Sequence, residues 1–149
     1  MSFLNSLKSF TSKASSEITD QFNRVKNKDI MVGVVASCTY VAYADGRVSP
    51  EEKNKMIGFL QNSECLKMYK ADEVIDTFGK FSRKFEFDKD MGVAEVFKAL
   101  GAISKTDEKK LIVRACIMIA NSDGNFDQSE KEAVRKICKE LGLDSSEFI

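Results

Sequence analysis

The chain of 149 residues has the length of one domain, and its 43% hydrophobic and 31% charged residues are typical of a globular protein. Lys plus Arg and Asp plus Glu each number 23, so there is no basic surplus for binding phosphates, and we expect no nucleic-acid partner. The chain has no histidine, no G-x-S-x-G motif and no phosphate-binding glycine loop, which argues against an enzyme. A single proline and the absence of alternating β-branched runs predict an all-α fold.

Residues 1–26 predict an amphipathic N-terminal arm. Apolar side chains at helical spacing form one stripe, and the opposite face is rich in serine, a poor helix former. The helix therefore needs a partner surface, which is either its own domain or a membrane or partner protein. The residues that would make the second kind of contact are Phe3, Leu7, Lys8, Phe10 and Lys13. We expect the residues before about position 17 to pack loosely.

The start of the chain lacks the continuous apolar core and the small-residue cleavage site of a secretory signal. No stretch approaches the roughly 18 apolar residues that are needed to span a bilayer. We therefore expect a cytoplasmic protein.

Residues 27–149 predict a single compact helical bundle. Residues 29–44 are apolar almost all round, as in a central buried helix, and the helix stops at the turn signal Asp45-Gly46. A second helix begins after Ser49, which is a natural N-cap, and Glu52 is placed to complete a capping box.

The middle of the chain, from about residue 63 to residue 104, predicts a short segment followed by two helices. The sequence GKFSRKFEF interleaves basic and aromatic residues, a pattern that can stack on single-stranded nucleic acid. Its phenylalanines fall at helical spacing, so we interpret them as core residues, with Lys80, Arg83 and Lys84 facing solvent.

Residues 108–122 again predict a helix that is apolar around its circumference, and this helix stops at Asp123-Gly124. Asp127 is placed as the N-cap of the next helix, and Glu130 as the partner in a second capping box.

The two helix–Asp-Gly–helix units form an internal repeat. Residues 34–60 align with residues 112–138 at an offset of 78, and the aligned pair shares the Asp-Gly turn and a Glu-Lys pair in order. The seven identical pairs are Val35/Val113, Cys38/Cys116, Ala42/Ala120, Asp45/Asp123, Gly46/Gly124, Glu52/Glu130 and Lys53/Lys131.

The segments VAYADGRVSPEEK and IANSDGNFDQSEK resemble the paired signatures of the TerB family, the small helical proteins of bacterial tellurite-resistance operons. The resemblance extends over nearly the whole chain, including the polar arm. It implies an all-α cytoplasmic protein that acts with a TerC-type membrane protein and calcium-binding TerD-type proteins in a membrane-associated stress response. It also implies that a divalent metal is held by the acidic signature residues, which are Asp45, Glu52, Asp123 and Glu130.

The second loop adds Asp127 to this set. Asp123, Asn125, Asp127 and Ser129 alternate along the chain, as oxygen ligands do in the first half of a calcium loop. Val134 stands where an EF-hand needs its bidentate glutamate, so that motif is excluded. Helix capping and turn formation explain much of the same pattern without a metal.

A site shared by both repeats would require the carboxylates of Asp45 and Asp123 to lie close together. Clustered carboxylates repel one another, so at least one should have a raised pKa.

The function predicted is that of a non-enzymatic binding and scaffold protein of the tellurite-resistance and stress-response system. It would hold a divalent cation, calcium or a similar ion, through the duplicated acidic loops and act with a membrane partner. The alternative is a thiol-based tellurite- or oxyanion-binding or redox protein. Cys38 and Cys116 lie among apolar helical residues and should be buried and unpaired, whereas Cys65 has the least apolar context.

Overall fold

The structure, a computed structural model, describes residues 16–21, 27–124 and 126–149. The described residues form helices and no strands, which confirms the predicted all-α fold. A short helical segment at residues 16–21 is followed by α2 (Lys28–Ala42), α3 (Pro50–Asn62), η1 (Glu64–Leu66), α4 (Ala71–Phe87), α5 (Lys89–Gly101), α6 (Thr106–Ala120), η2 (Asn121–Asp123), α7 (Gln128–Leu141) and η3 (Ser145–Glu147). The five residues predicted to contact a membrane or partner all lie outside the described residues.

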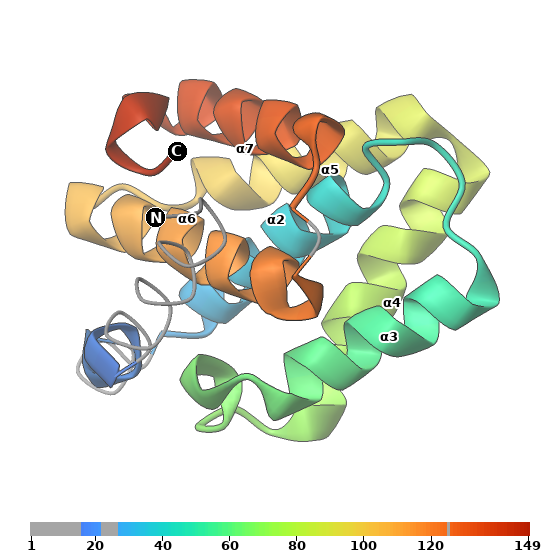
Figure 1. Ribbon diagram of the computed structural model, residues 1–149, viewed down its shortest axis with the longest axis horizontal. Coiled ribbons are helices and arrows are strands. Elements are labelled where there is room, and N and C mark those ends of the chain that lie inside the picture. The colour runs from blue at the N-terminus through green and yellow to red at the C-terminus, as the bar shows by residue number, and fades with distance from the viewer. Residues whose placement is uncertain (1–15, 22–26, 125) are drawn as a thin grey trace.

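Helix α2 is the centre of the bundle. It contacts α4, α5, α6 and α7, and Figure 1 shows it running through the middle of the molecule. Ten of its fifteen residues are buried, which is possible because the helix is apolar around most of its circumference. Helix α6 packs against it with Ile112, Ala115 and Cys116 among its buried residues. Two central apolar helices are therefore confirmed, and each ends two residues earlier than predicted.

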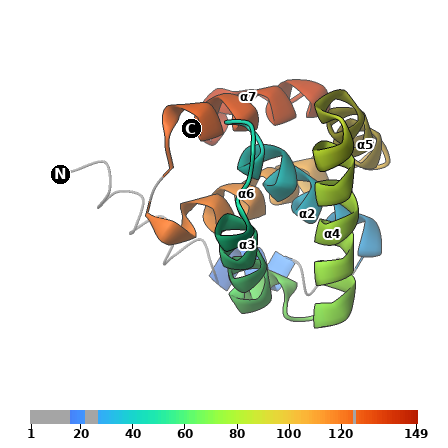
Figure 2. The same cartoon turned by 90° about the vertical axis from the view of Figure 1, so that its right-hand side faces the viewer.

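Helices α3 and α4 run side by side in front of α2 in the view of Figure 2. Three phenylalanines of α4, Phe78, Phe81 and Phe85, are buried, and its basic residues face solvent, as predicted. The interpretation of Phe87 as a core residue is wrong, because it lies two positions after Phe85, on another side of the helix, and is 80% exposed. The ring of Phe85 stacks on the ring of Tyr43 with 4.9 Å between the centroids. This stack holds the end of α2 against α4.

The short segment at residues 16–21 belongs to the bundle, because Ile18 is 3% exposed and forms part of the core. Figures 1 and 2 both place this segment near the end of α3 and the adjoining η1. Within the described residues, no helix combines the length and apolar character required to cross a membrane.

Candidate functional site: an acidic groove between the two repeats

The first Asp-Gly pair makes a sharp turn at the end of α2. The N–H of Gly46 donates to the carbonyl oxygen of Tyr43 at 3.1 Å, and Gly46 has a φ of 114°, a backbone angle that other residues rarely adopt. The side chain of Asp45 is left exposed beside the turn.

The second Asp-Gly pair repeats this arrangement after α6. The N–H of Gly124 donates to the carbonyl oxygen of Asn121 at 3.0 Å, and Gly124 has a φ of 74°. Both pairs therefore end a buried helix with a glycine at positive φ, which supports their interpretation as copies of one unit.

The helix that follows each turn begins with a cap. At α7 the predicted capping box is confirmed: Oδ1 of Asp127 accepts the N–H of Glu130 at 2.9 Å, and Oε1 of Glu130 accepts the N–H of Asp127 at 3.4 Å. At α3 the box is only half formed. Oγ of Ser49 accepts the N–H of Glu52 at 3.2 Å, but the Glu52 carboxylate accepts the Ser49 hydroxyl at 3.1 Å instead of the backbone N–H.

The two loops meet at the hydroxyl group of Ser129. This hydroxyl is hydrogen bonded to Oδ1 of Asp45 from the first loop, and it lies 2.8 Å from Oδ1 of Asp127 in the second. A hydroxyl carries one proton, so it can donate to only one of the two carboxylates at a time. Residues that are 84 positions apart in the chain thus share one contact.

A groove of about 290 Å³ opens at this junction, between α3, the ends of α2 and α6, and the start of α7. We call it the acidic groove. Its charged lining residues are Asp45, Glu52, Lys55, Asp127 and Glu130, and its apolar ones are Val41, Ala42, Val48, Met56, Phe59, Ile119 and Ala120. Four of the five predicted metal ligands therefore line one groove. The side chain of the fifth, Asp123, lies outside the described part of the structure, and with it the distance between the Asp45 and Asp123 carboxylates.

The carboxylates share the groove without forming a coordination shell. Among the side chains that the structure describes, no three acidic or thiol groups are close enough together to hold one metal ion. The reason is visible in the caps, because Glu52 and Glu130 both turn back to the starts of their own helices. The donor set is nevertheless all oxygen, which is the ligand type that calcium and magnesium prefer.

Hydrogen bonds favour the ionised form of the Asp127 carboxylate. The N–H of Glu130 and the hydroxyl of Ser129 both donate to this carboxylate and lower its pKa below the usual value of an aspartate. The predicted raised pKa concerned the carboxylates of Asp45 and Asp123, and it stays a prediction. Asp127 stays ionised throughout the neutral pH range.

The four cysteines are all buried and unpaired, which confirms the prediction for Cys38 and Cys116. The pKa of Cys38 is well above the usual value, because its thiol is hydrogen bonded to Cys116 and is fully buried. Burial also raises the pKa of Cys138, to about 11. Reactive thiols need exposure and a lowered pKa, so this arrangement argues against the thiol-based alternative.

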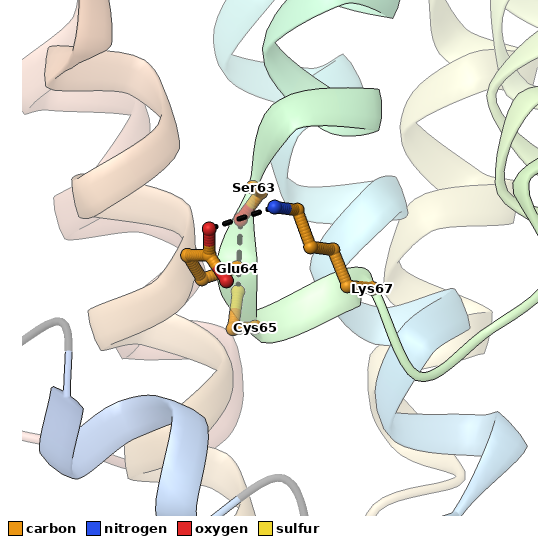
Figure 3. Close-up of polar contacts among 4 residues, drawn as sticks. All are labelled: Ser63, Glu64, Cys65 and Lys67. Atoms are coloured by element: carbon orange, nitrogen blue, oxygen red, sulfur yellow. Dashed lines mark hydrogen bonds and ion pairs between the residues drawn. The ribbon is translucent and has the colours of Figure 1, made fainter.

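Cys65 is buried in spite of its polar neighbours. Its sulfur lies 3.1 Å from the hydroxyl oxygen of Ser63, and Nζ of the neighbouring Lys67 lies 2.7 Å from Oε1 of Glu64. Figure 3 shows both contacts side by side. The charged pair stays at the surface while Cys65 turns into the core, and burial raises the pKa of its thiol. The turn of the short 3₁₀-helix η1 thus directs Cys65 into the core and leaves Glu64 and Lys67 exposed.

Sequence reasoning missed the walls of the groove and the role of Ser129 as a junction. Lys55, Met56 and Phe59 follow Glu52 at intervals of three, four and seven residues, which places all four on one face of α3. That spacing was a usable signal once Glu52 had been identified as a candidate ligand.

Comparisons with known proteins agree with the duplicated motif. The family model described as tellurite resistance protein TerB matches residues 31–149. A tellurium resistance protein TerB from Alcaligenes sp is 43% identical over 108 residues, which cover 72% of this chain and 88% of the relative. No solved structure matches the chain. The family match begins inside α2, so the predicted arm lies outside it, and the resemblance is narrower than expected from the sequence. With its family-model match over most of its length, this chain belongs to the TerB family of tellurite resistance proteins.

Proposed function

We propose that the chain is a non-enzymatic binding and scaffold protein of the tellurite-resistance and stress-response system, and that it binds a divalent cation in the acidic groove. The observation that carries the proposal is the shared contact of Asp45 and Asp127 at Ser129, which joins the loops of both repeats. A duplication that served only to cap helices would not need its two loops to meet.

The chemistry of the groove suits a hard cation such as calcium. Calcium takes six to eight oxygen ligands at about 2.3–2.6 Å, and the groove offers four carboxylates, two of which contact the hydroxyl group of Ser129. The hydroxyl of Ser129 and the N–H of Glu130 contact Oδ1 of these aspartates, Asp45 and Asp127, so the second oxygen of each carboxylate can face an ion. Glu52 and Glu130 would join by leaving their caps, and Asp123 remains a proposed ligand.

Cation binding is tested by isothermal titration with calcium, magnesium and manganese chlorides. Asp45→Asn and Asp127→Asn should each weaken the affinity at least about tenfold, because each removes a charged ligand worth about 1.4 kcal/mol or more. Asp123→Asn tests the fifth ligand in the same way. Asp76→Asn, an exposed aspartate on α4, is the matched control and should leave the affinity unchanged. The absence of binding heat with all three ions, or equal affinity in the wild type and in Asp45→Asn, would overturn the proposal.

The partners proposed from the family are a TerC-type membrane protein and TerD-type proteins, with peripheral membrane contact through the arm. The arm combines apolar residues with Lys8 and Lys13, a composition that favours the interface of an anionic bilayer. Vesicles with and without anionic lipid test this contact. Phe3→Ser with Phe10→Ser should abolish cosedimentation, and Lys8→Gln with Lys13→Gln should weaken it most at low salt.

The cellular role is tested by expressing variants in cells whose tellurite-resistance operon lacks this chain. The wild type should restore growth on tellurite, and Asp45→Asn with Asp127→Asn should not. Restoration by this double variant would separate resistance from the groove.

A further inference from the structure

One face of α3 is only partly covered by the residues that the structure describes, although its counterpart in the second repeat is buried. The groove residues Lys55, Met56 and Phe59 of α3 correspond, at the offset of 78, to Ala133, Val134 and Ile137 of α7. The three α7 residues are buried against the core, whereas Met56 and Phe59 are half-buried and Lys55 is exposed. The first repeat thus leaves this amphipathic surface open, whereas the corresponding surface of the second repeat is buried against the core.

The open surface combines an apolar wall with a negatively charged rim. Met56, Phe59 and Val48 offer half-buried apolar side chains, and four carboxylates surround them with a single ammonium group, that of Lys55. A ligand that fits this surface carries apolar side chains along one line and positive charge beside them.

The first fifteen residues of the chain have this complementary pattern. They contain two lysines and no aspartate or glutamate. In a helix, Phe3, Leu7 and Phe10 lie on one stripe with Leu4 at its edge. At about 100° per residue, Lys8 lies about 40° beyond Leu4 on one flank, and Lys13 lies about 60° beyond Phe10 on the other. We infer that, when no cation is bound, this arm docks in the acidic groove of its own molecule, with the stripe on the apolar wall and the lysines facing the carboxylates of the rim.

The arm is long enough and begins in the right place. The described chain starts at the helical segment 16–21, which is held in the core by Ile18 and lies near the end of α3 in Figures 1 and 2. From that end, the groove residues of α3 extend back over about ten residues, or about 15 Å of helix. Fifteen residues span about 22 Å as a helix and up to about 50 Å when extended. The arm can therefore run back along α3 to Glu52.

Docking of the arm and binding of a cation would exclude each other, because both use the same carboxylates. This competition rests on the proposed function, because it makes the arm a regulator of cation binding. A groove that is partly occupied by the arm binds calcium with an apparent affinity reduced by the fraction of open molecules. Cation binding in turn releases the apolar stripe for contact with the membrane.

Methionine methyl NMR in the presence of EDTA tests the docking without any cation. Met56 lines the groove, and Met91, 38% exposed on α5 and outside the groove lining, is the remote reference. Replacing the stripe by Phe3→Ser, Leu7→Ser and Phe10→Ser should shift the Met56 methyl signal and leave the Met91 signal in place. Lys8→Gln with Lys13→Gln should move the Met56 signal in the same direction by a smaller amount.

The matched control is Ser9→Gln with Ser12→Gln, which alters the opposite face of the arm helix and should change neither signal. An identical Met56 signal in the wild type and the stripe variant overturns the inference, whatever calcium does. A Met56 shift that disappears on dilution also overturns it, because the arm would then come from a second copy of the chain.

Calcium titration separates this inference from the proposed function. The stripe variant should bind calcium at least about threefold more tightly than the wild type, since no arm competes for the groove. Equal affinities would overturn the competition. The absence of binding in both proteins, together with the Met56 shift, would reject the cation and leave the docked arm standing.

Discussion

Helices α3 and α7 are the second helices of the two repeats, but they bury different numbers of residues. Within α3, all of which the structure describes, Leu60 alone is buried. Helix α7 buries five residues, Ala133, Val134, Ile137, Cys138 and Leu141. Helix α7 contacts α2, α5 and α6, whereas α3 packs mainly on α4 and η1. Duplication therefore supplied one helix that completes the core and one that forms the wall of a groove.

The largest expected effect compares two corresponding positions, Ile137 in α7 and Phe59 in α3. Ile137 is 1% exposed, so Ile137→Ala should lower the free energy of unfolding by about 2–5 kcal/mol through lost burial and a cavity. Phe59 is half-buried in the groove wall, so Phe59→Ala should cost less, about 1 kcal/mol. Urea unfolding monitored by circular dichroism measures both. Equal losses would place Phe59 in the core and remove the distinction between the helices.

The next effect compares the caps of the same two helices. Asp127 is held in a reciprocal box, whereas Ser49 accepts the backbone bond without reciprocation by Glu52. Measured in EDTA, Asp127→Ala should lower the free energy of unfolding by about 1–2 kcal/mol and Ser49→Ala by about 0.5–1 kcal/mol. Asp76→Ala on α4 is the control and should fall within about 0.5 kcal/mol of the wild type. A larger loss from Ser49→Ala would contradict the ranking.

These caps also mark what the sequence can predict. The turn glycines, the N-caps and the apolar faces of α2 and α6 depend on interactions within a few residues, so local patterns identify them. The repeat added a long-range expectation, that two acidic loops have a common role. The turns, caps and apolar faces could thus be read from residues that are close together in the chain, and the common role of the loops from the alignment of the two repeats.

Side-chain directions in the groove could not be predicted in the same way. Glu52 and Glu130 occupy matching positions, yet one accepts a hydroxyl group and the other a backbone N–H. The apolar positions of α3 and α7 also match, so periodicity alone does not say which helix face meets the core. That choice depends on how α3 packs against α4. The contact between Asp45 and Ser129 is likewise a result of tertiary packing.

A smaller effect concerns the pH dependence of the second cap. The pKa of Asp127 is lowered in the folded protein by the N–H of Glu130 and the hydroxyl of Ser129. The stabilisation from Asp127 is therefore complete above the unfolded pKa of about 4, and it is lost as pH falls through the lower folded pKa. The free energy of unfolding should therefore decrease less steeply between pH 5 and pH 2 in Asp127→Asn than in the wild type. Urea unfolding in EDTA at several pH values measures this difference. An unchanged slope would show that the hydrogen bonds do not favour the ionised carboxylate.

The smallest expected effect tests whether the two repeats are joined at their loops. Ser129 is half-buried and its hydroxyl contacts Asp45 from the first repeat and Asp127 from its own. Each of Ser129→Ala and Asp45→Asn alone should change the free energy of unfolding by about 0.5 kcal/mol, as surface substitutions do. Because the two side chains are in contact, the double variant should differ from the sum by about 0.5 kcal/mol or more, whereas Asp76→Asn with Ser129→Ala should be additive within about 0.3–0.5 kcal/mol. Additivity of Asp45→Asn with Ser129→Ala would mean that the loops lie side by side without energetic coupling. The cycle should be repeated with calcium, since an ion held by Asp45 and Asp127 would replace the hydroxyl as their link and change the coupling between these positions.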